Sequence, residues 1–254
     1  IAPKVDHLTI FQRTANWLGN VPQYHDDVPD GQQWLFRHIP HYVHWYRFWL
    51  FWATVEGLLP AVRVDETWEP QDRSVSPRND QLRALLTGYL EREFEVVHDW
   101  VASERPLFGV CLGGQMIAHV SGGSVFKASE REFGWAQIDV LPAAHDDPVA
   151  GFGADRLTGL AWHDYAFEPP PGSTTLASNS VCVQAFRHGE AWGFQHHPEI
   201  ESSVLDGWLA PVLTDPDPER REQAELLEAG REAHMPAWND YGRELFRRFA
   251  TRCR

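Results

Sequence analysis

Cysteine is scarce in this sequence: only Cys111, Cys182 and Cys253 occur among its 254 residues. The three residues lie far apart, and no Cys-x-x-Cys pair is present. An odd number without such a pair argues against a disulfide framework and against a zinc site, and it suits a reducing compartment. We therefore expect a cytoplasmic protein without a bound metal.

Basic side chains are also few. Lysine and arginine together number 22 against 36 aspartates and glutamates, which gives a formal net charge of −14. A chain of this charge without a basic cluster repels a polyanion at long range. No nucleic-acid partner is therefore expected.

Long apolar runs are missing as well. The most apolar stretch, FWLFWA at residues 48–53, is bounded by Arg47 and Glu56. A membrane span needs about 20 apolar residues, so this stretch is too short. Its aromatic side chains could suit a membrane surface, but such stretches more often form a packed core helix. We expect no membrane partner.

The first hundred residues are mostly helical in pattern. Alternation over residues 5–12 predicts one strand. Aromatic residues recur at three- and four-residue steps over residues 32–59, which predicts one or two helices interrupted at Pro40 and closed by Pro60. A further helix is expected from Asn79 to about residue 100.

Strands and connecting segments alternate after residue 105. A short apolar strand over residues 107–110 leads through a tight turn into a helix. Charged residues after Pro211 predict a largely helical tail with a break at Pro236. Further strands are expected at residues 135–141, 174–178, 182–187 and 192–196. The alternation predicts an α/β domain followed by a helical tail.

Cys111 is the strongest candidate for a nucleophile. It stands between Gly109 and Gly113 at a strand-to-helix turn, where small neighbours tolerate a strained backbone and the helix N-terminus favours a thiolate. The amide of Leu112 would then point at a developing oxyanion. A buried cysteine before a glycine-rich helix gives the same pattern, so the partner residues must decide.

A base and an acid for this nucleophile are expected in the stretch GFQHHPE at residues 193–199. Pro198 keeps the segment extended, so His197 and Glu199 can lie on one side while His196 faces away, where it could pack. His197 would take the thiol proton, and Glu199 would fix its tautomer. An isolated His-Pro-Glu could be a solvated turn, but its place after the cysteine turn favours a triad.

Two motifs carry a family resemblance. GVCLGGQ at residues 109–115 together with GFQHHPE resembles the class I glutamine amidotransferases, especially those similar to the amidotransferase domain of GMP synthase. The resemblance covers about residues 100–201. It implies a partial flavodoxin-like domain, attack of Cys111 on the side-chain amide of glutamine through a γ-glutamyl thioester, and a synthase or other partner that accepts the ammonia. It also implies that glutamine is contacted by Gln115, Gly134 and Trp135.

Residues 1 to about 95 resemble a different family. IAPKVDHLTIFQRTANW, WYRFWLFWATVEGLLPAVRVD and RSVSPRNDQLRALLTGYL, at residues 1–17, 45–65 and 73–90, are similar to Baeyer-Villiger flavin monooxygenases acting on aryl ketones such as 4-hydroxyacetophenone. By this resemblance Arg13 and Thr14 would contact the 2′-phosphate and adenosine of NADPH. In the simpler alternative, Arg13 is a surface arginine.

The glycine-rich loops that either family needs are not recognisable. No G-x-G-x-x-G fingerprint for NADPH or FAD occurs, which argues against flavin chemistry, so no cofactor is expected. The amidotransferase strands that would precede the cysteine turn and supply a second oxyanion-hole amide are not recognised either. We therefore expect two partial domains, residues 1–95 and 96–254, joined by a genuine fusion or by an assembly artefact. A catalytically impaired binding module stays the alternative to an active enzyme.

Overall fold

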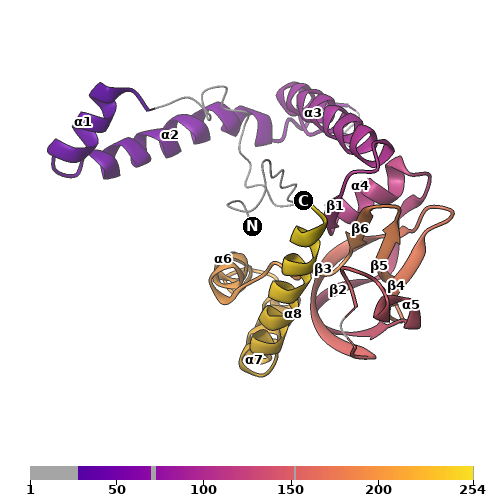
Figure 1. The fold of residues 1–254 in the computed structure, drawn as a ribbon. Helices are drawn as coiled ribbons and strands as arrows, with labels where there is room; N and C mark the ends of the chain where they lie inside the picture. Colours follow the sequence, from indigo (N-terminus) through magenta and orange to yellow (C-terminus); the bar gives the residue numbers. More distant parts are fainter. Residues whose placement is uncertain (1–27, 70–72, 152, 254) are drawn as a thin grey trace. The chain divides into compact units, whose positions relative to one another are not determined.

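The computed structural model describes residues 28–69, 73–151 and 153–253. The strand expected at residues 5–12, together with Arg13 and Thr14, lies outside these ranges. The chain divides into two compact units between Glu93 and Phe94, and each unit is described by itself (Figure 1).

The first unit is helical. Its helices are α1 (Asp30–His38), α2 (Tyr42–Val62) and the beginning of α3 (Pro77–Ala102). The interruption expected at Pro40 is confirmed, because α1 and α2 are separated there. Pro60 does not close α2, which runs on to Val62, since a proline removes one backbone donor without preventing the next residues from staying helical.

Asn79 joins two helices of this unit. Its side-chain nitrogen donates to the carbonyl of Ala61 at 2.8 Å, and its side-chain oxygen accepts from the amide of Val75 at 3.2 Å. The helix expected to begin at Asn79 begins two residues earlier, at Pro77. A proline is favourable at the first helical position, because the amide hydrogen it lacks has no partner there.

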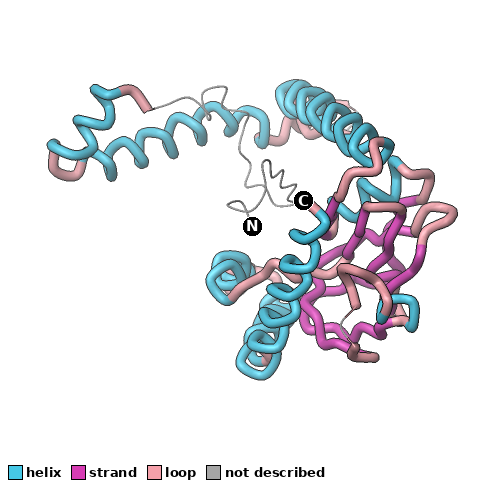
Figure 2. The backbone as a smooth tube through the Cα atoms, viewed as in Figure 1, coloured by secondary structure: helices cyan, strands magenta, loops and turns pink. Residues whose placement is uncertain are grey.

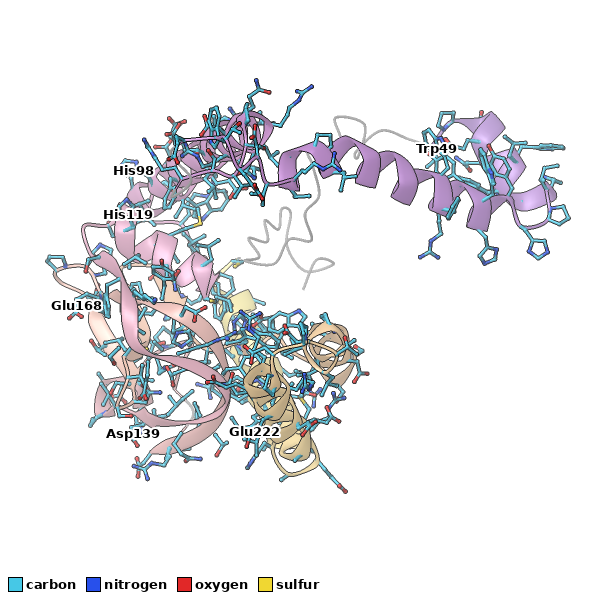
Figure 3. All side chains as sticks on the ribbon, turned by 180° about the vertical axis from the view of Figure 1, so that it is seen from behind. Trp49, His98, His119, Asp139, Glu168 and Glu222 are labelled. Atoms are coloured by element: carbon cyan, nitrogen blue, oxygen red, sulfur yellow. The ribbon has the colours of Figure 1, made fainter. Side chains whose placement is uncertain are left out.

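The aromatic stretch of α2 is not a packed core helix over the side chains that the structure describes. Phe48 and Trp49, the latter labelled in Figure 3, are 62% and 48% exposed. Trp45 is exposed as well. No helix of the described ranges is both long enough and apolar enough to cross a membrane.

The second unit is built on a six-stranded mixed sheet of order β1-β6-β5-β4-β2-β3 (Figures 1 and 2). Only β1 and β6 are parallel; the other neighbours are antiparallel. The strands are β1 (Leu107–Val110), β2 (Ser124–Val140), β3 (Arg156–Glu168), β4 (Thr174–Ser178), β5 (Val183–His188) and β6 (Ala191–Phe194). The expected α/β class is confirmed.

Strands β2 and β3 form a long hairpin that the sequence shows only in part. The expected strand at residues 135–141 is the second half of β2, and β3 has no counterpart among the expected strands. Its burial does not alternate, and it contains Gly159, where an added Cβ would strike Ile138 and Trp238. The two strands are also joined by an ion pair of 2.6 Å between Arg156 and Asp139, which is labelled in Figure 3.

Helices cover both faces of the sheet. On one face, Phe194 and Trp192 pack with Leu245 and Phe249 of α8. On the other face, Phe186 and neighbouring strand residues pack against α4 and the end of α3. The helices of this unit are α4 (Leu112–Val120), α5 (Pro142–His145), α6 (Ser202–Val212), α7 (Pro218–Ala229) and α8 (Arg231–Arg252).

The helical tail breaks at Gly230 rather than at Pro236, so that part of the prediction is wrong. A Cβ at Gly230 would come within 2.5 Å of the Trp135 ring, so a residue with a side chain would disturb the packing there. Pro236 lies inside α8. A contact with β2 therefore requires glycine at the break, and that contact has no local sequence signal.

Candidate active site at the carboxyl ends of β1 and β6

Cys111 occupies the turn between β1 and α4, as the sequence predicts. Its φ of 49° and ψ of −104° are unusual for a residue with a side chain, and such strain occurs mainly at functional sites. The amide of Cys111 donates to the carbonyl of Phe194 at 2.7 Å. A Cβ on Gly109 would collide with the backbone of Gly113, so the turn requires glycine at position 109.

The parallel pairing of β1 with β6 brings the two motifs together. Val110 is opposite Phe194 in this pairing, so the residues that follow each strand emerge at the same edge of the sheet. Carboxyl ends of parallel strands are the usual place for an α/β active site. The amide of His197 donates to the carbonyl of Leu160 at 2.9 Å, which fixes the histidine segment against β3.

His197 lies between an acid and the thiol. Its Nδ1 is 2.8 Å from Oε1 of Glu199, and only 4% of the residue is exposed. Burial alone would lower the pKa of His197, but its side-chain interactions with Cys111 and Glu199 raise that pKa to about 10. Because Nδ1 is engaged by Glu199, Nε2 is left for the thiol. A raised pKa favours the imidazolium, the form that stabilises a thiolate.

His196 faces away from this group, as expected from strand alternation. Its Nε2 is 3.1 Å from the hydroxyl of Tyr241, and its ring contacts those of Phe194 and Trp238. Burial and the positive charge of His197 lower the pKa of His196 to about 3. It is therefore neutral and serves packing.

Gln195 is a site residue that sequence reasoning missed. Its Nε2 lies 3.6 Å from Sγ of Cys111, and its Oε1 accepts from Nε2 of Gln115 at 3.3 Å. The signal was available, since Gln195 is two residues before His197 and falls on the same side of an extended segment.

The other expected site residues lie on α4 and β2. Leu112 is the first residue of α4, so its amide has no acceptor within the helix. Gly134 has a φ of 131° on β2. Nε1 of Trp135 donates to the carbonyl of Leu227 at 2.9 Å, so the indole is engaged with α7, and its backbone lies opposite Leu160 in the pairing of β2 with β3.

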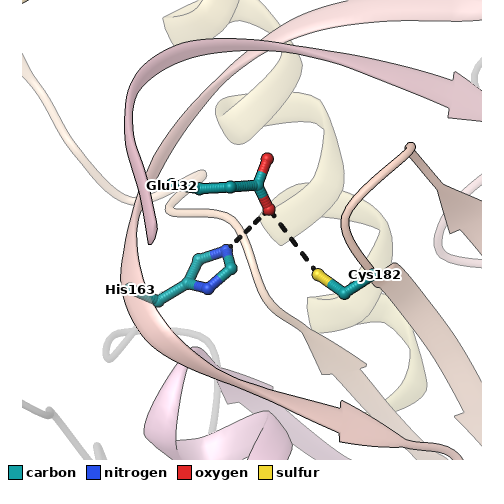
Figure 4. A group of neighbouring side chains, drawn as sticks. All are labelled: Glu132, His163 and Cys182. Carbon is teal, nitrogen blue, oxygen red and sulfur yellow. Dashed lines mark hydrogen bonds and ion pairs between the residues drawn. The ribbon is translucent and has the colours of Figure 1, made fainter. Parts of the chain in front are cut away.

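A second polar group lies inside the sheet unit, formed by Glu132, His163 and Cys182 (Figure 4). Oε2 of the glutamate is 3.0 Å from Nε2 of the histidine and 3.6 Å from the sulfur. The side-chain nitrogens of Asn179 and Gln184 also donate to this carboxylate, at 2.6 and 2.8 Å. No sequence signal joined these residues, because they come from separate segments.

These residue types could ligate a metal, and they also hydrogen-bond to one another. Burial opposes ionisation of Glu132, yet its contacts with His163 and Asn179 hold its pKa below the usual value. Burial and the nearby carboxylate raise the pKa of the Cys182 thiol far above its usual range. The protonated thiol donates a hydrogen bond to that carboxylate, 3.6 Å away. The group therefore acts as a hydrogen-bond network that joins β2, β3 and the β4–β5 connection.

Similarity to known proteins agrees with this geometry. The sequence model of the glutamine amidotransferase class-I family matches residues 76–209, more than half of the chain. The chain belongs to the class-I glutamine amidotransferase family. A relative from Methanothermobacter thermautotrophicus, described as one subunit of a glutamine-hydrolyzing GMP synthase, is 32% identical to this chain over 147 residues. The match covers 56% of this chain and 76% of that protein.

A solved structure of a glutamine amidotransferase from Thermotoga maritima shares the fold of this chain. It has a TM-score of 0.57 and 27% identity, and the match covers 64% of this chain and 70% of that one. An uncharacterized monooxygenase of Sinorhizobium fredii is 37% identical over 108 residues, or 42% of this chain and 16% of that protein. This match agrees with the second resemblance. The chain spans a fifth or less of the first curated relatives it matches (16% and 20%).

Proposed function

We propose that this amidotransferase releases ammonia from glutamine with Cys111 as nucleophile, His197 as base and Glu199 as the acid that orients it. The observation that carries the proposal is the parallel pairing of β1 with β6. That pairing supports a common site for the strained cysteine turn and for a histidine held 2.8 Å from a carboxylate.

The reaction proceeds in two steps. The thiolate of Cys111 attacks the side-chain amide carbon of glutamine, and the amide of Leu112 donates to the oxyanion. Protonated His197 gives its proton to the leaving nitrogen, so the C–N bond breaks and ammonia and a γ-glutamyl thioester form. His197 then takes a proton from water, which attacks the thioester. The C–S bond breaks, and glutamate and the thiolate are released.

The substrate is held by Gln115 and by the backbone of Gly134 and Trp135 in this proposal. Both hydrogens of the Gln115 carboxamide are engaged, one by the carbonyl of Tyr165 at 2.8 Å and one by Gln195 at 3.3 Å. Only its oxygen is left, so Gln115 would accept a hydrogen bond from a nitrogen of glutamine.

We also propose a synthase, in a partner or in another domain, as the acceptor of the ammonia. Support comes from relatives that carry the name of a glutamine-hydrolyzing GMP synthase. Because the chain matches only a small share of the length of most of these relatives, the ammonia acceptor stays a proposal.

The domain assignment, residues 1–95 and 96–254, is likewise a proposal, and the division of the chain between Glu93 and Phe94 supports it. NADPH binding by Arg13 and Thr14 rests on resemblance alone. It predicts a measurable NADPH affinity that Arg13→Ala weakens. If titration of the chain with NADPH up to millimolar concentration detects no binding, this interpretation is wrong.

The alternative of an impaired enzyme depends on whether the described residues before Cys111 supply a second oxyanion donor. Within residues 28–69 and 73–100, every glycine lies inside a helix, namely Gly31, Gly57 and Gly88. None of them lies in a loop of the kind expected to supply a second oxyanion amide. Loss of one such donor costs about 10²–10³-fold in rate, so this alternative predicts slow turnover with intact labelling of Cys111.

Covalent labelling tests the proposal. A glutamine analogue with an electrophilic side chain should label the full chain at Cys111, and Cys111→Ala should abolish the labelling. Cys253→Ala, a change in a partly buried cysteine near the chain end, should leave it intact. Labelling that persists in folded Cys111→Ala would contradict the assignment of Cys111 as the nucleophile.

A further inference from the structure

The carboxamide of Gln195 lies against the reacting atom but has no part in the two steps above. Gln195 follows β6 and is completely buried. Its Nε2 is 3.6 Å from Sγ of Cys111, which is a hydrogen-bond distance for a sulfur acceptor. Cys111 is also completely buried, so water gives its charge little stabilisation.

The orientation of this carboxamide follows from its neighbours. The carbonyl of Tyr165 can only accept, so it faces the NH₂ group of Gln115 at 2.8 Å. The same NH₂ group points its second hydrogen at Gln195, 3.3 Å away, so Gln195 must present its oxygen there. Its own NH₂ group therefore faces the sulfur. The reversed carboxamide would set two NH₂ groups against each other.

The backbone holds Gln195 in this position. Its amide donates to the carbonyl of Gln184 on β5 at 2.9 Å. The donor is thus placed before any substrate arrives. A preorganised donor in a site that excludes water costs no rearrangement during the reaction.

We propose that Gln195 is a further catalytic residue, which donates a hydrogen bond to the thiolate of Cys111. This inference rests on the proposed function, because it takes Cys111 as the nucleophile. A hydrogen bond to the charged form favours that form, so Gln195 increases the thiolate fraction before attack. When the thioester breaks, the electron pair of the C–S bond returns to sulfur, and the same donor stabilises the departing thiolate.

Alkylation tests this role without glutamine. The full chain with Gln195→Met keeps a side chain of similar length but loses the donor. Reaction of Cys111 with iodoacetamide is followed across pH by mass spectrometry of its peptide, which separates it from Cys182 and Cys253. We expect the midpoint of the pH profile to rise by about one unit, so that alkylation below the midpoint slows about tenfold.

Two further variants keep the result interpretable. Gln137→Met removes an exposed carboxamide that is hydrogen-bonded to Thr158 at 2.8 Å, and it should leave the midpoint unchanged. Gln195→Glu still accepts from Gln115 but places a negative charge beside the sulfur, so its midpoint should lie above that of Gln195→Met. Its midpoint should also lie above that of the wild type, so it provides the test if Gln195→Met does not fold.

An unchanged midpoint in a folded Gln195 variant would overturn the inference. The result is separable from the proposed function, because iodoacetamide needs no glutamine site. A wild-type chain that fails to hydrolyse glutamine but shows the Gln195 dependence would refute the function and leave the thiolate donor in place.

Discussion

Replacing Glu199 by glutamine removes the negative charge beside His197 while keeping the size of the side chain. The native contact is 2.8 Å between Nδ1 and Oε1, and the Glu199 side chain is only 26% exposed. A hydrogen bond with a charged partner contributes about 1.5–3 kcal/mol and a neutral one about 1 kcal/mol. The difference, about 0.5–2 kcal/mol, corresponds to a shift centred on about one pKa unit. The pKa of His197, raised to about 10 in the native site, should therefore fall to about 9.

Proton NMR of the imidazole ring across pH measures this shift, with the His197 signal assigned by its loss in His197→Gln. Glu201→Gln is the matched control, because Glu201 is an exposed carboxylate two residues further along the chain. It should not move the signal. A pKa of His197 that is the same in Glu199→Gln and in the wild type would refute the reasoning that the carboxylate holds the imidazolium.

Three further outcomes follow. Because the folded-state pKa of His197 is raised to about 10, its contribution to stability is complete below about pH 6.5, its unfolded value. The contribution is lost as pH rises through 10. The difference in unfolding free energy between the wild type and His197→Gln should therefore shrink over that window in denaturant titrations. Gly109→Ala should destabilise by about 1–3 kcal/mol, because its Cβ meets the backbone of Gly113. Gly113→Ala, whose Cβ meets nothing within 4 Å, should not destabilise the fold. Glu132→Ala should cost about 3–5 kcal/mol, because it leaves a buried network without its charge. Exposed Asp146→Ala should cost little, and equal stability of the two variants in urea would contradict this account of the network.

Local pattern is enough to predict several elements. The strand before Cys111 and the strand over residues 174–178 are predicted within a residue, because short apolar runs there are bounded by turns. Alternation separates His197 from His196. The same alternation predicts that Gln195 faces the site, since residues 195, 197 and 199 share one side of an extended chain.

Tertiary contacts decide the features that the sequence does not reveal. Glycine is required at the break, Gly230, by the Trp135 ring, which is far away in the sequence. Strand β3 carries no clean alternation, because its residues are buried by several helices and by β2. The network around Glu132 joins three segments. No window of the sequence contains it, so only the fold could show it.

Glutamine hydrolysis by the full chain tests the central claim most directly. We predict equal amounts of ammonia and glutamate from the wild type, the same products from Cys253→Ala, and none from Cys111→Ala. Hydrolysis by Cys111→Ala at the wild-type rate, or no hydrolysis by a folded wild-type chain, would contradict the account.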